Sequence, residues 1–375
     1  MIRARLFPEI RGHIIIEANC QNGGIGVLKV KVLVGLSGGV DSAVAASYLL
    51  EAGYEVGGAY MRMIDGGGKM SDSTDARKVA ELLQIPFYEL DMRSVFREEV
   101  LNYFTQSYRA GRTPNPCVRC NEKLKFGAFL KAAQDLGYDR IATGHYARIT
   151  KGADGLYRLQ KADNREKDQN YFLYHLTQEQ LEMSIFPLEG VDKEQIREKA
   201  RAIGLHVAEK KDSQDICFVE QGRYIEFIEA YTGEVSAPGD FVDTEGNVIG
   251  HHKGIERYTI GQRKGVETAF GRPLYVVSKD AESRRVVMGE HGDLMTDVLY
   301  ADRVRIHPAY EALIREGNFA CVGRHRYGQK DIPVRASLDG DLLKVQFETA
   351  QRAVTPGQIV VLYDGDIVVS GGEIC

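Results

Sequence analysis

The sequence predicts an α/β protein with a doubly wound parallel sheet in its first part, a small middle domain and a C-terminal antiparallel β-barrel. From about residue 30, short apolar strands alternate with amphipathic helices, which is typical of a parallel sheet covered on both faces. From about residue 225, short β-prone runs between turns rich in Gly and Asp replace the helices. The last hundred residues form short alternating strands with tight turns, which favours a small barrel.

Length and composition are those of an ordinary soluble protein. The 375 residues allow two or three domains, and 43% hydrophobic with 27% charged residues indicates a real core. We expect a dispensable extension at 1–29, a first domain at 30–224, a middle domain at 225–280 and the barrel at 281–375. No apolar run approaches the roughly 20 residues that span a bilayer. Six cysteines without an export signal indicate a reducing cytoplasm.

The elements of the first domain follow from periodicity and end signals. Residues 30–60 predict a strand, a glycine turn, a helix and a second strand, which together make a βαβ unit. The stretch "SDSTDARKVAELLQI" carries an N-cap signal and predicts a helix, and "PFYELDM" follows as a strand. A helix is expected from about Ser94 to Tyr108. After a loop with two cysteines, another helix carries Phe126 and Phe129 on one face, before the strand "RIATG".

The stretch "GLSGGVDS" lies where the first strand gives way to the first helix. Backbone N–H groups and the helix dipole point at an anion there, so we expect a phosphate site. Glycines allow close approach, serines add hydroxyl donors, and Asp41 is placed to hold the loop or a magnesium ion. A simple tight turn is the alternative. The residues predicted to bind the nucleotide are Gly35, Leu36, Ser37, Gly38, Gly39, Val40, Asp41 and Ser42.

This SGGxDS pattern resembles the loop of the N-type ATP pyrophosphatases, adenine nucleotide alpha hydrolase-like proteins that cleave ATP between its α and β phosphates and adenylate a substrate. Six further segments resemble the tRNA-specific 2-thiouridylases, in that family's order: "GRTPNPCVRCN", "IATGHYAR", "KDQNYFLYHL", "KKDSQDICFV", "YTIGQRKG" and "TPGQIVVLYDGDIVVSGG". The resemblance implies ATP and Mg2+ as cofactors and the wobble uridine of tRNA as substrate. The 2-oxo group is activated by ATP, pyrophosphate leaves, and sulfur from a relay or cysteine desulfurase protein replaces the oxygen.

The chemistry itself requires a sulfur nucleophile. A urea-like carbonyl must first become an adenylate, and a cysteine persulfide or an iron-bound sulfide then attacks it near neutral pH. The resemblance implies that Cys217 carries the persulfide and that Cys120 frees the sulfur. Arg112, Arg119 and Lys123 are the nearest cations, and we expect them to lower the thiol pKa. A small buried hydrophobic side chain is the alternative for Cys217.

Cys117 departs from the best-known form of the family, which has an aspartate at this position. With Cys117, Cys120 and Cys217 the chain has three candidate ligands for a [4Fe–4S] cluster, whose open iron would hold the sulfide to be transferred. The sequence does not choose between a cluster and a persulfide without one. Structural zinc with His145 as the fourth ligand is a further option. A thioredoxin-like pair fits poorly, because "PNP" precedes the first cysteine.

A net charge of −5 means that any RNA footprint must be local. By the resemblance, Asn115, Pro116 and Cys117 face the target base, which must leave its stack. Further residues match the family's tRNA-contact and nucleotide-lining positions. The tRNA contacts are Lys167, Asp168, Gln169, Arg326 and Tyr327, and the nucleotide contacts are Met61 and Gly144. Candidate phosphate-contacting cations are Arg109, Arg112, Arg119, Lys123, Lys125, Arg263, Lys264, Arg324 and Arg326.

Two other functions stay open. A different adenylating enzyme with the same loop would not need the cysteines, so removing Cys217 would leave its activity intact. A non-catalytic tRNA-binding protein, with cysteines around a structural metal, would bind tRNA without consuming ATP. The tRNAs used, the sulfur donor and the oligomeric state are not encoded in any pattern of the sequence.

Overall fold

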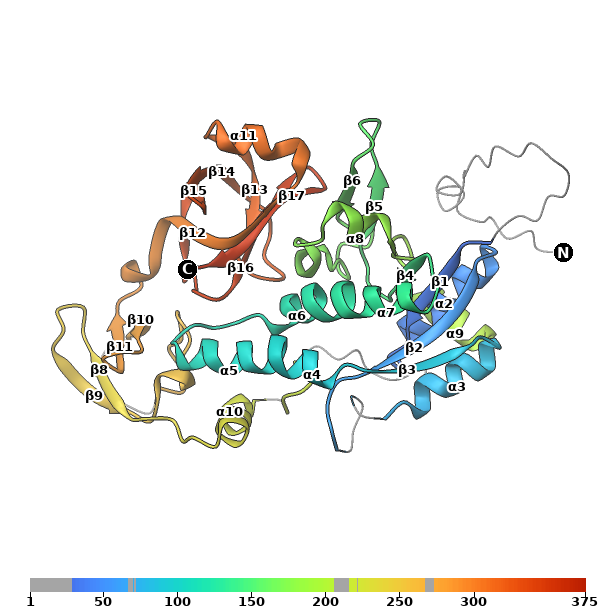
Figure 1. The fold of residues 1–375 in the computed structure, drawn as a ribbon. Coiled ribbons are helices and arrows are strands. Elements are labelled where there is room, and N and C mark those ends of the chain that lie inside the picture. Colours follow the sequence, from blue (N-terminus) through green and yellow to red (C-terminus); the bar gives the residue numbers. More distant parts are fainter. Residues whose placement is uncertain (1–28, 67–69, 71, 206–215, 221, 267–272) are drawn as a thin grey trace, which may run out of the picture.

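The computed structural model describes residues 29–375, apart from 67–69, 71, 206–215, 221 and 267–272. Residues 1–28 of the predicted extension lie outside the described residues. Figure 1 shows a sheet domain, a small middle sheet and a barrel, with long helices running beneath the barrel. None of the helices in the described ranges has the length and apolar character needed to cross a bilayer.

The predicted doubly wound parallel sheet is confirmed. Its strands, in spatial order, are β3 (Phe87–Asp91), β2 (Glu55–Arg62), β1 (Lys31–Gly35), β4 (Arg140–Ala142) and β7 (Ser184–Ile185). The register pairs Val32 with Val56 on one side and with Arg140 on the other, always in parallel. The chain leaves β1 toward β2 and later returns to the other side of β1. In sheets of this kind, ligands bind at such a reversal, outside the carboxyl ends of the two strands concerned, here β1 and β4.

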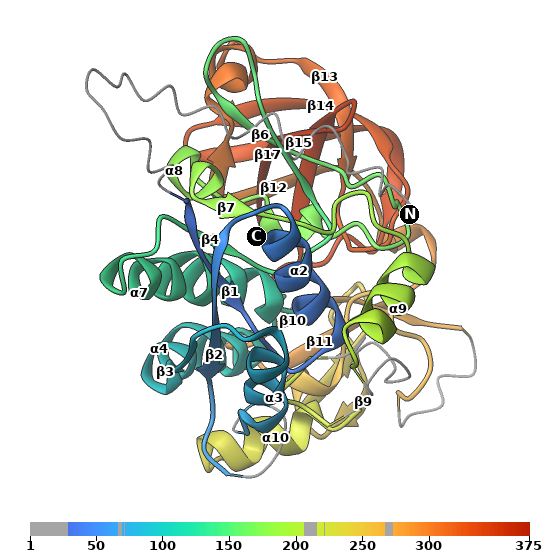
Figure 2. The same cartoon turned by 90° about the vertical axis from the view of Figure 1, so that its right-hand side faces the viewer.

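Helices cover both faces of this sheet because β1 is apolar on both faces. Val32 and Val34 pack on one side and Leu33 on the other, all without solvent exposure. Figure 2 shows α2 and α3 on one side of β1 and β2, and α4 and α7 on the other. The helices of this domain are α2 (Val40–Glu51), α3 (Thr74–Leu83), α4 (Arg93–Phe96), η1 (Arg97–Leu101), α5 (Asn102–Arg109), α6 (Pro116–Arg119), η2 (Cys120–Ala128), α7 (Phe129–Asp135), η3 (Asn170–Leu173), α8 (Gln178–Glu182) and α9 (Lys193–Ala202).

The middle part begins with α10 (Tyr224–Thr232) and contains a second, small sheet. Its strands, in spatial order, are β10 (Tyr275–Asp280), β11 (Arg285–Gly289), β8 (Gly239–Val242) and β9 (Val248–His252), with η4 (Ile255–Arg257) between β9 and β10. Phe241, Val276 and Val286 form its core. β10 and β11, which lie on either side of the boundary predicted at residue 280, pair with each other. The domain boundaries stay a prediction.

The C-terminal part is the predicted antiparallel barrel. It closes because β12 pairs with β15 on one side and with β17 on the other. Its elements are η5 (Gly292–Leu294), β12 (Met295–Ile306), η6 (Pro308–Tyr310), α11 (Glu311–Arg315), β13 (Phe319–Arg324), β14 (Ile332–Asp339), β15 (Leu342–Arg352), β16 (Ile359–Asp364) and β17 (Ile367–Ile374).

A hairpin from the first domain extends the sheet of the barrel. It consists of β5 (Arg148–Lys151) and β6 (Tyr157–Gln160), and Gln160 pairs with Ile367 of β17. The hydrophobic core is continuous across this junction, since Phe129 beneath the parallel sheet and Val361 of the barrel belong to one buried cluster. The sheet domain and the barrel are therefore packed as one body.

Candidate active site

The phosphate loop connects β1 to α2. Ser37 and Ser42 approach each other with their Oγ atoms 3.3 Å apart, and Ser42 Oγ donates to the carbonyl of Gly39 at 3.1 Å. The N-cap of α2 is Gly39, which has no side chain to accept from the first amides of the helix. The loop therefore presents hydroxyls and backbone N–H groups at a helix N-terminus, as a phosphate requires.

Two predicted nucleotide-lining residues flank this loop. A Cβ on Gly144 would lie 3.0 Å from the backbone nitrogen of Ser42, so the chain after β4 touches the start of α2. A Cβ on Gly35 would lie 3.3 Å from Cε of Met61. Gly144 follows β4 and Met61 lies on β2, so they flank the loop from the two strands that neighbour β1. Their contact with a nucleotide stays a prediction.

The two neighbouring cysteines lie on a helix, and the predicted loop at this position is wrong. Asn115 caps α6 by accepting a hydrogen bond from the N–H of Val118 at 3.4 Å, and Pro116 occupies the first turn. Cys117 is exposed in this turn, and the buried Cys120 begins the π-helical stretch η2. One turn of helix separates the two thiols and presents them on the same face.

Cys217 belongs to the same electrostatic environment. Its neighbours point inward, with Ile216 and Phe218 in an aromatic cluster around Phe104, while Cys217 itself is exposed. Burial of its surroundings raises the pKa of Cys217 to about 12, and the charges of Cys120 and Cys117 add to this effect. The three thiols are thus close enough to influence one another. The preceding "KKDSQD" of this motif lies outside the described residues.

Lys125 is the cation that acts on all three thiols. Burial raises the pKa of Cys120, and the protein atoms packed around the sulfur of Cys117 raise its pKa although part of this residue is exposed; in each case the charge of Lys125 opposes the rise. The Nζ atom of Lys125 lies 3.5 Å from Nε2 of His145, whose Nδ1 is 2.7 Å from Oγ1 of Thr143. Burial keeps the pKa of His145 well below its usual value, so this ring is neutral near pH 7.

The predicted cations near the cysteines are paired with carboxylates instead. Arg119 contacts Glu99 at 2.9 Å and Glu122 at 2.8 Å, and Lys123 contacts Glu122 at 3.0 Å. Ion pairs hold further cations of the predicted set: Arg109 with Glu256, Arg112 with Glu373 and Arg324 with Asp331. The prediction that Arg112, Arg119 and Lys123 tune the thiols is therefore wrong. Lys125 and His145 are 20 residues apart on different elements, so no sequence pattern predicted their contact.

The three cysteines and His145 are the candidate metal ligands that the sequence suggested. Among the residues that the structure describes, no group of three or more His, Cys, Asp or Glu side chains is arranged to hold a metal ion. Cys117, Cys120 and Cys217 influence one another electrostatically and His145 contacts Lys125, but these four side chains do not form a ligand set in this conformation.

The residues predicted to contact tRNA lie in two segments that meet. Arg326 and Tyr327 are exposed on the loop between β13 and β14. The ring of Tyr327 lies 4.5 Å from that of Phe172, which follows closely on the segment 167–169. Phe172 was not predicted, although the aromatic pair in "NYFLY" was visible. The two segments therefore share one surface with aromatic and basic side chains.

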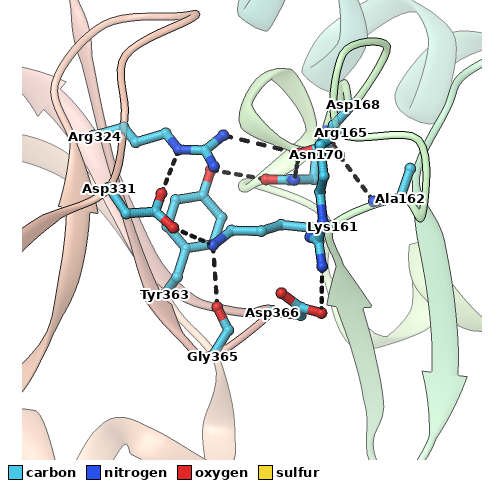
Figure 3. Close-up of polar contacts among 10 residues, drawn as sticks. All are labelled: Lys161, Ala162, Arg165, Asp168, Asn170, Arg324, Asp331, Tyr363, Gly365 and Asp366. Atoms are coloured by element: carbon cyan, nitrogen blue, oxygen red, sulfur yellow. Dashed lines mark hydrogen bonds and ion pairs between the residues drawn. The ribbon is translucent and has the colours of Figure 1, made fainter.

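Asp168 is buried and faces inward, whereas its neighbours Lys167 and Gln169 are half-buried. Its Oδ1 accepts from the N–H of Ala162 at 3.0 Å, and its Oδ2 accepts from the side chain of Asn170. Arg324 of the barrel lies 3.9 Å from Oδ2 (Figure 3). Burial raises the pKa of Asp168, and the hydrogen bonds from Ala162 and Asn170 oppose this rise. Asp168 thus holds the segment 167–169 in place.

A buried polar network joins this segment to the barrel (Figure 3). The ammonium of Lys161, which is 5% exposed, donates to Asp331 at 2.7 Å and to the carbonyl of Gly365 at 3.1 Å. Arg324 donates to the same aspartate at 2.6 Å, and the Tyr363 hydroxyl donates to Asn170 at 2.8 Å. Because its members lie far apart along the chain, the network could not be predicted.

Family profiles match nearly the whole described chain. The profile described as the tRNA methyl transferase HUP domain matches residues 30–221, the tRNA methyl transferase PRC-barrel domain matches 225–290, and the aminomethyltransferase beta-barrel domain matches 296–374. Among solved structures, the U34-tRNA thiolase NcsA from Methanococcus maripaludis is 18% identical with a TM-score of 0.35, covering 60% of this chain and 69% of that chain.

Full-length relatives are much closer. The tRNA-specific 2-thiouridylase MnmA of Lachnoclostridium phytofermentans is 46% identical over 92% of this chain and 99% of its own length. The proteins of the same name from Acetivibrio thermocellus and Clostridioides difficile are 46% and 44% identical over 92% of this chain, covering 99% and 98% of their own lengths. The chain therefore belongs to the family of tRNA-specific 2-thiouridylases.

Proposed function

We propose that this protein is an ATP-dependent tRNA-uridine 2-sulfurtransferase that acts in the cytoplasm on the wobble uridine. The 2-oxo group of the uridine attacks the α-phosphorus of ATP, and pyrophosphate leaves. The phosphate loop binds the triphosphate, and Asp41 is the residue best placed to hold Mg2+, which would neutralise charge on the leaving group. Sulfur then attacks C2 of the adenylate, and AMP departs with the original oxygen.

The different exposures of Cys217 and Cys120 support different roles for them in sulfur transfer. Cys217 is exposed, so a sulfur-relay or desulfurase protein can deliver sulfur to it as a persulfide, whereas Cys120 is buried. The terminal sulfur of the persulfide attacks C2, and the Cys120 thiolate then attacks Sγ of Cys217. The bond between the two sulfurs of the persulfide breaks, which releases 2-thiouridine and leaves a disulfide between the cysteines. A thiol reductant restores both thiols.

The junction between Gly144 and His145 is the observation that carries this proposal. Gly144 packs on Ser42 of the phosphate loop, and the next residue contacts Lys125, whose charge acts on all three thiols. These contacts support an arrangement in which a nucleotide on the loop and a sulfur on the cysteines face one uridine from two sides. A protein that only binds RNA would have no need for a phosphate loop beside a set of cysteines.

The test is ATP-dependent thiolation of an unmodified tRNA transcript by protein purified without oxygen. We expect formation of AMP, pyrophosphate and 2-thiouridine, the last measured by mass spectrometry of nucleosides. Cys217→Ala and Cys120→Ala should each lower thiolation at least about 100-fold, since each removes a covalent step. Cys321→Ala, which changes a cysteine of the barrel core, is the matched control and should keep full activity.

The variant Cys117→Asp distinguishes sulfur transfer from a persulfide from sulfur transfer from an iron–sulfur cluster. Retained activity supports the persulfide route, whereas equal loss in all three cysteine variants, together with loss of a brown chromophore and of iron, supports a cluster. ATP consumption that does not depend on any cysteine would indicate a different adenylating enzyme. Binding of tRNA without ATP consumption would indicate a non-catalytic protein.

A further inference from the structure

Tyr146 connects the phosphate loop to the tRNA-contact segment. Its hydroxyl donates to Oδ1 of Asp41 at 3.0 Å, although the two residues are 105 positions apart. Its backbone N–H donates to Oε1 of Gln169 at 3.0 Å, and the N–H of Gln169 donates to the carbonyl of Tyr146 at 2.8 Å. The ring is 4% exposed, so these bonds lie in a medium where a hydrogen bond to a carboxylate is strong.

The other end of this segment is fixed to the barrel. Asp168 contacts Arg324, and Asn170 accepts from Tyr363 at 2.8 Å (Figure 3). The loop with the predicted tRNA contacts Arg326 and Tyr327 begins directly after Arg324. An unbroken series of contacts therefore runs from the exposed barrel loop through Asp168 and Gln169 to Tyr146 and Asp41.

Lys167, one of the predicted tRNA contacts, lies beside this series of contacts. Its ammonium lies 5.8 Å from the centre of the Tyr146 ring. When a tRNA phosphate attracts Lys167, the position of this cation relative to the ring changes, and so does the field at the Tyr146 hydroxyl. The hydroxyl in turn sets the orientation of a carboxylate at the phosphate loop, and this orientation decides how much negative charge faces the triphosphate.

We propose that Tyr146 is a positioning residue through which bound tRNA tightens the binding of ATP. The proposal rests on the proposed function, because it requires both ligands. Contact of tRNA with the segment 167–169 orders Gln169 and Tyr146, and Tyr146 then holds Asp41 in the orientation that accepts the nucleotide. The coupling is reciprocal, so the nucleotide tightens tRNA binding by the same factor.

The experiment measures equilibrium binding of a non-hydrolysable ATP analogue, α,β-methylene ATP, with and without a saturating unmodified tRNA transcript. In the unaltered protein we expect tRNA to lower the Kd of the analogue about tenfold, the size of one hydrogen bond to a charged group. The coupling ratio is the Kd of the analogue without tRNA divided by its Kd with tRNA. In Tyr146→Phe, which loses only the hydroxyl, the coupling ratio should fall to within about twofold of unity, while the Kd for tRNA alone changes less than about twofold.

Tyr157→Phe is the matched control, since it also removes one hydroxyl that donates to a carboxylate, Glu182, at 3.1 Å. Tyr157→Phe should keep the tenfold effect of tRNA on the Kd of the analogue that is expected of the unaltered protein, about 1.4 kcal/mol. A ratio in Tyr146→Phe equal to that of the unaltered protein, or a ratio of unity in the unaltered protein, would overturn the proposal. If Tyr146→Phe does not fold, Gln169→Leu tests the same connection and should also reduce the ratio.

Failure of the proposed function has a different signature. In that case the unaltered protein binds no tRNA, or it binds tRNA and the analogue without forming 2-thiouridine from ATP. A protein that thiolates tRNA but shows equal ratios in the unaltered and Tyr146→Phe forms would retain its function and lose only the positioning role.

Discussion

Gly38 shows how closely a single residue can constrain the phosphate loop. It adopts a left-handed backbone conformation with φ of 72°, and a Cβ there would lie 2.8 Å from Cβ of Asp75. We expect Gly38→Ala to raise the KM for ATP at least about tenfold, because the loop must shift away from α3. The KM is measured from the rate of pyrophosphate release at varied ATP concentration.

Gly53 provides the control for Gly38. It also has a positive φ, of 91°, but nothing lies within 4 Å of an added Cβ. Gly53→Ala should cost about 1 kcal/mol in stability through backbone strain alone and leave the KM for ATP unchanged. An equal rise of KM in both variants would mean that the close approach to Asp75 is not what matters.

His175 makes stability depend on pH. Burial lowers its pKa from 6.5 to about 4 in the folded protein. The unfolded chain therefore binds more protons between these values, and stability falls as the pH decreases from 6.5 toward 4. We expect the unfolding free energy to drop by about 2 kcal/mol more between pH 7 and pH 5 in the unaltered protein than in His175→Gln.

Urea unfolding at the two pH values measures this difference. His251→Gln, at a side chain that is 80% exposed, is the control and should keep the full pH dependence. An unchanged difference in His175→Gln would show that this ring is already protonated in the folded state or that its pKa is ordinary.

Local residues of the site could be predicted and distant partners could not. The spacing of Gly38, Gly39 and Ser42 follows from what a phosphate needs over a few residues of chain. By contrast, the contact of Lys125 with His145 depends on how the cysteine helix is placed against the end of β4. No short pattern encodes such a placement.

At the scale of elements, the start of the cysteine helix was the main error. The two prolines suggested a rigid loop, yet Asn115 followed by Pro116 is also the signature of an N-cap and a first helical residue. The helical continuation through η2 and α7 was predicted only from its later, apolar part. The corrected start explains why Cys117 and Cys120 share a face.

Asn115 has a capping role as well as a predicted role in reading the base, and two variants separate them. Asn115→Asp keeps an oxygen that accepts from Val118, so the stability should change little. Asn115→Ala should lower the unfolding free energy by about 1 kcal/mol. Thermal unfolding and thiolation rates measure the two effects.

The activities decide whether the amide of Asn115 reads the base. If it does, both variants lose thiolation, because neither retains the amide N–H donors. Full thiolation in Asn115→Asp, with a loss only in Asn115→Ala, would assign this residue to helix capping alone.

At the scale of the whole molecule, the junction of the sheet domain and the barrel holds the fold together. Lys161 is buried there with Asp331, whereas Arg165 and Asp366 form a pair 2.7 Å apart with both side chains 50% exposed. We expect Lys161→Met to lower the unfolding free energy by about 3 kcal/mol, because hydrogen bonds to Asp331 and Gly365 are lost in a buried place.

Arg165→Met at the same junction should cost less than about 1 kcal/mol, since solvent screens an exposed pair. Urea unfolding of both variants measures the contrast. Similar losses in the two variants would mean that the buried network contributes no more than a surface ion pair.

The fold class and the three-part organisation were predictable because they depend on periodicity within short windows. Helices alternating with apolar strands specified the parallel sheet, and the strand-rich end specified the barrel. The junction was not predictable, since β5 and β6 lie inside the first domain and nothing in "YRLQ" indicates a partner in the barrel.

The pairing of β6 with β17 has a consequence for synthesis on the ribosome. Lys161, directly after β6, contacts Gly365, which lies 204 positions later in the chain. At about 5–20 residues per second, a nascent chain therefore exposes the unpaired edge of β6 for about 10–40 s before its partner emerges. During this interval the hairpin is open to pairing with other chains, and a chaperone that covers strand edges would protect it.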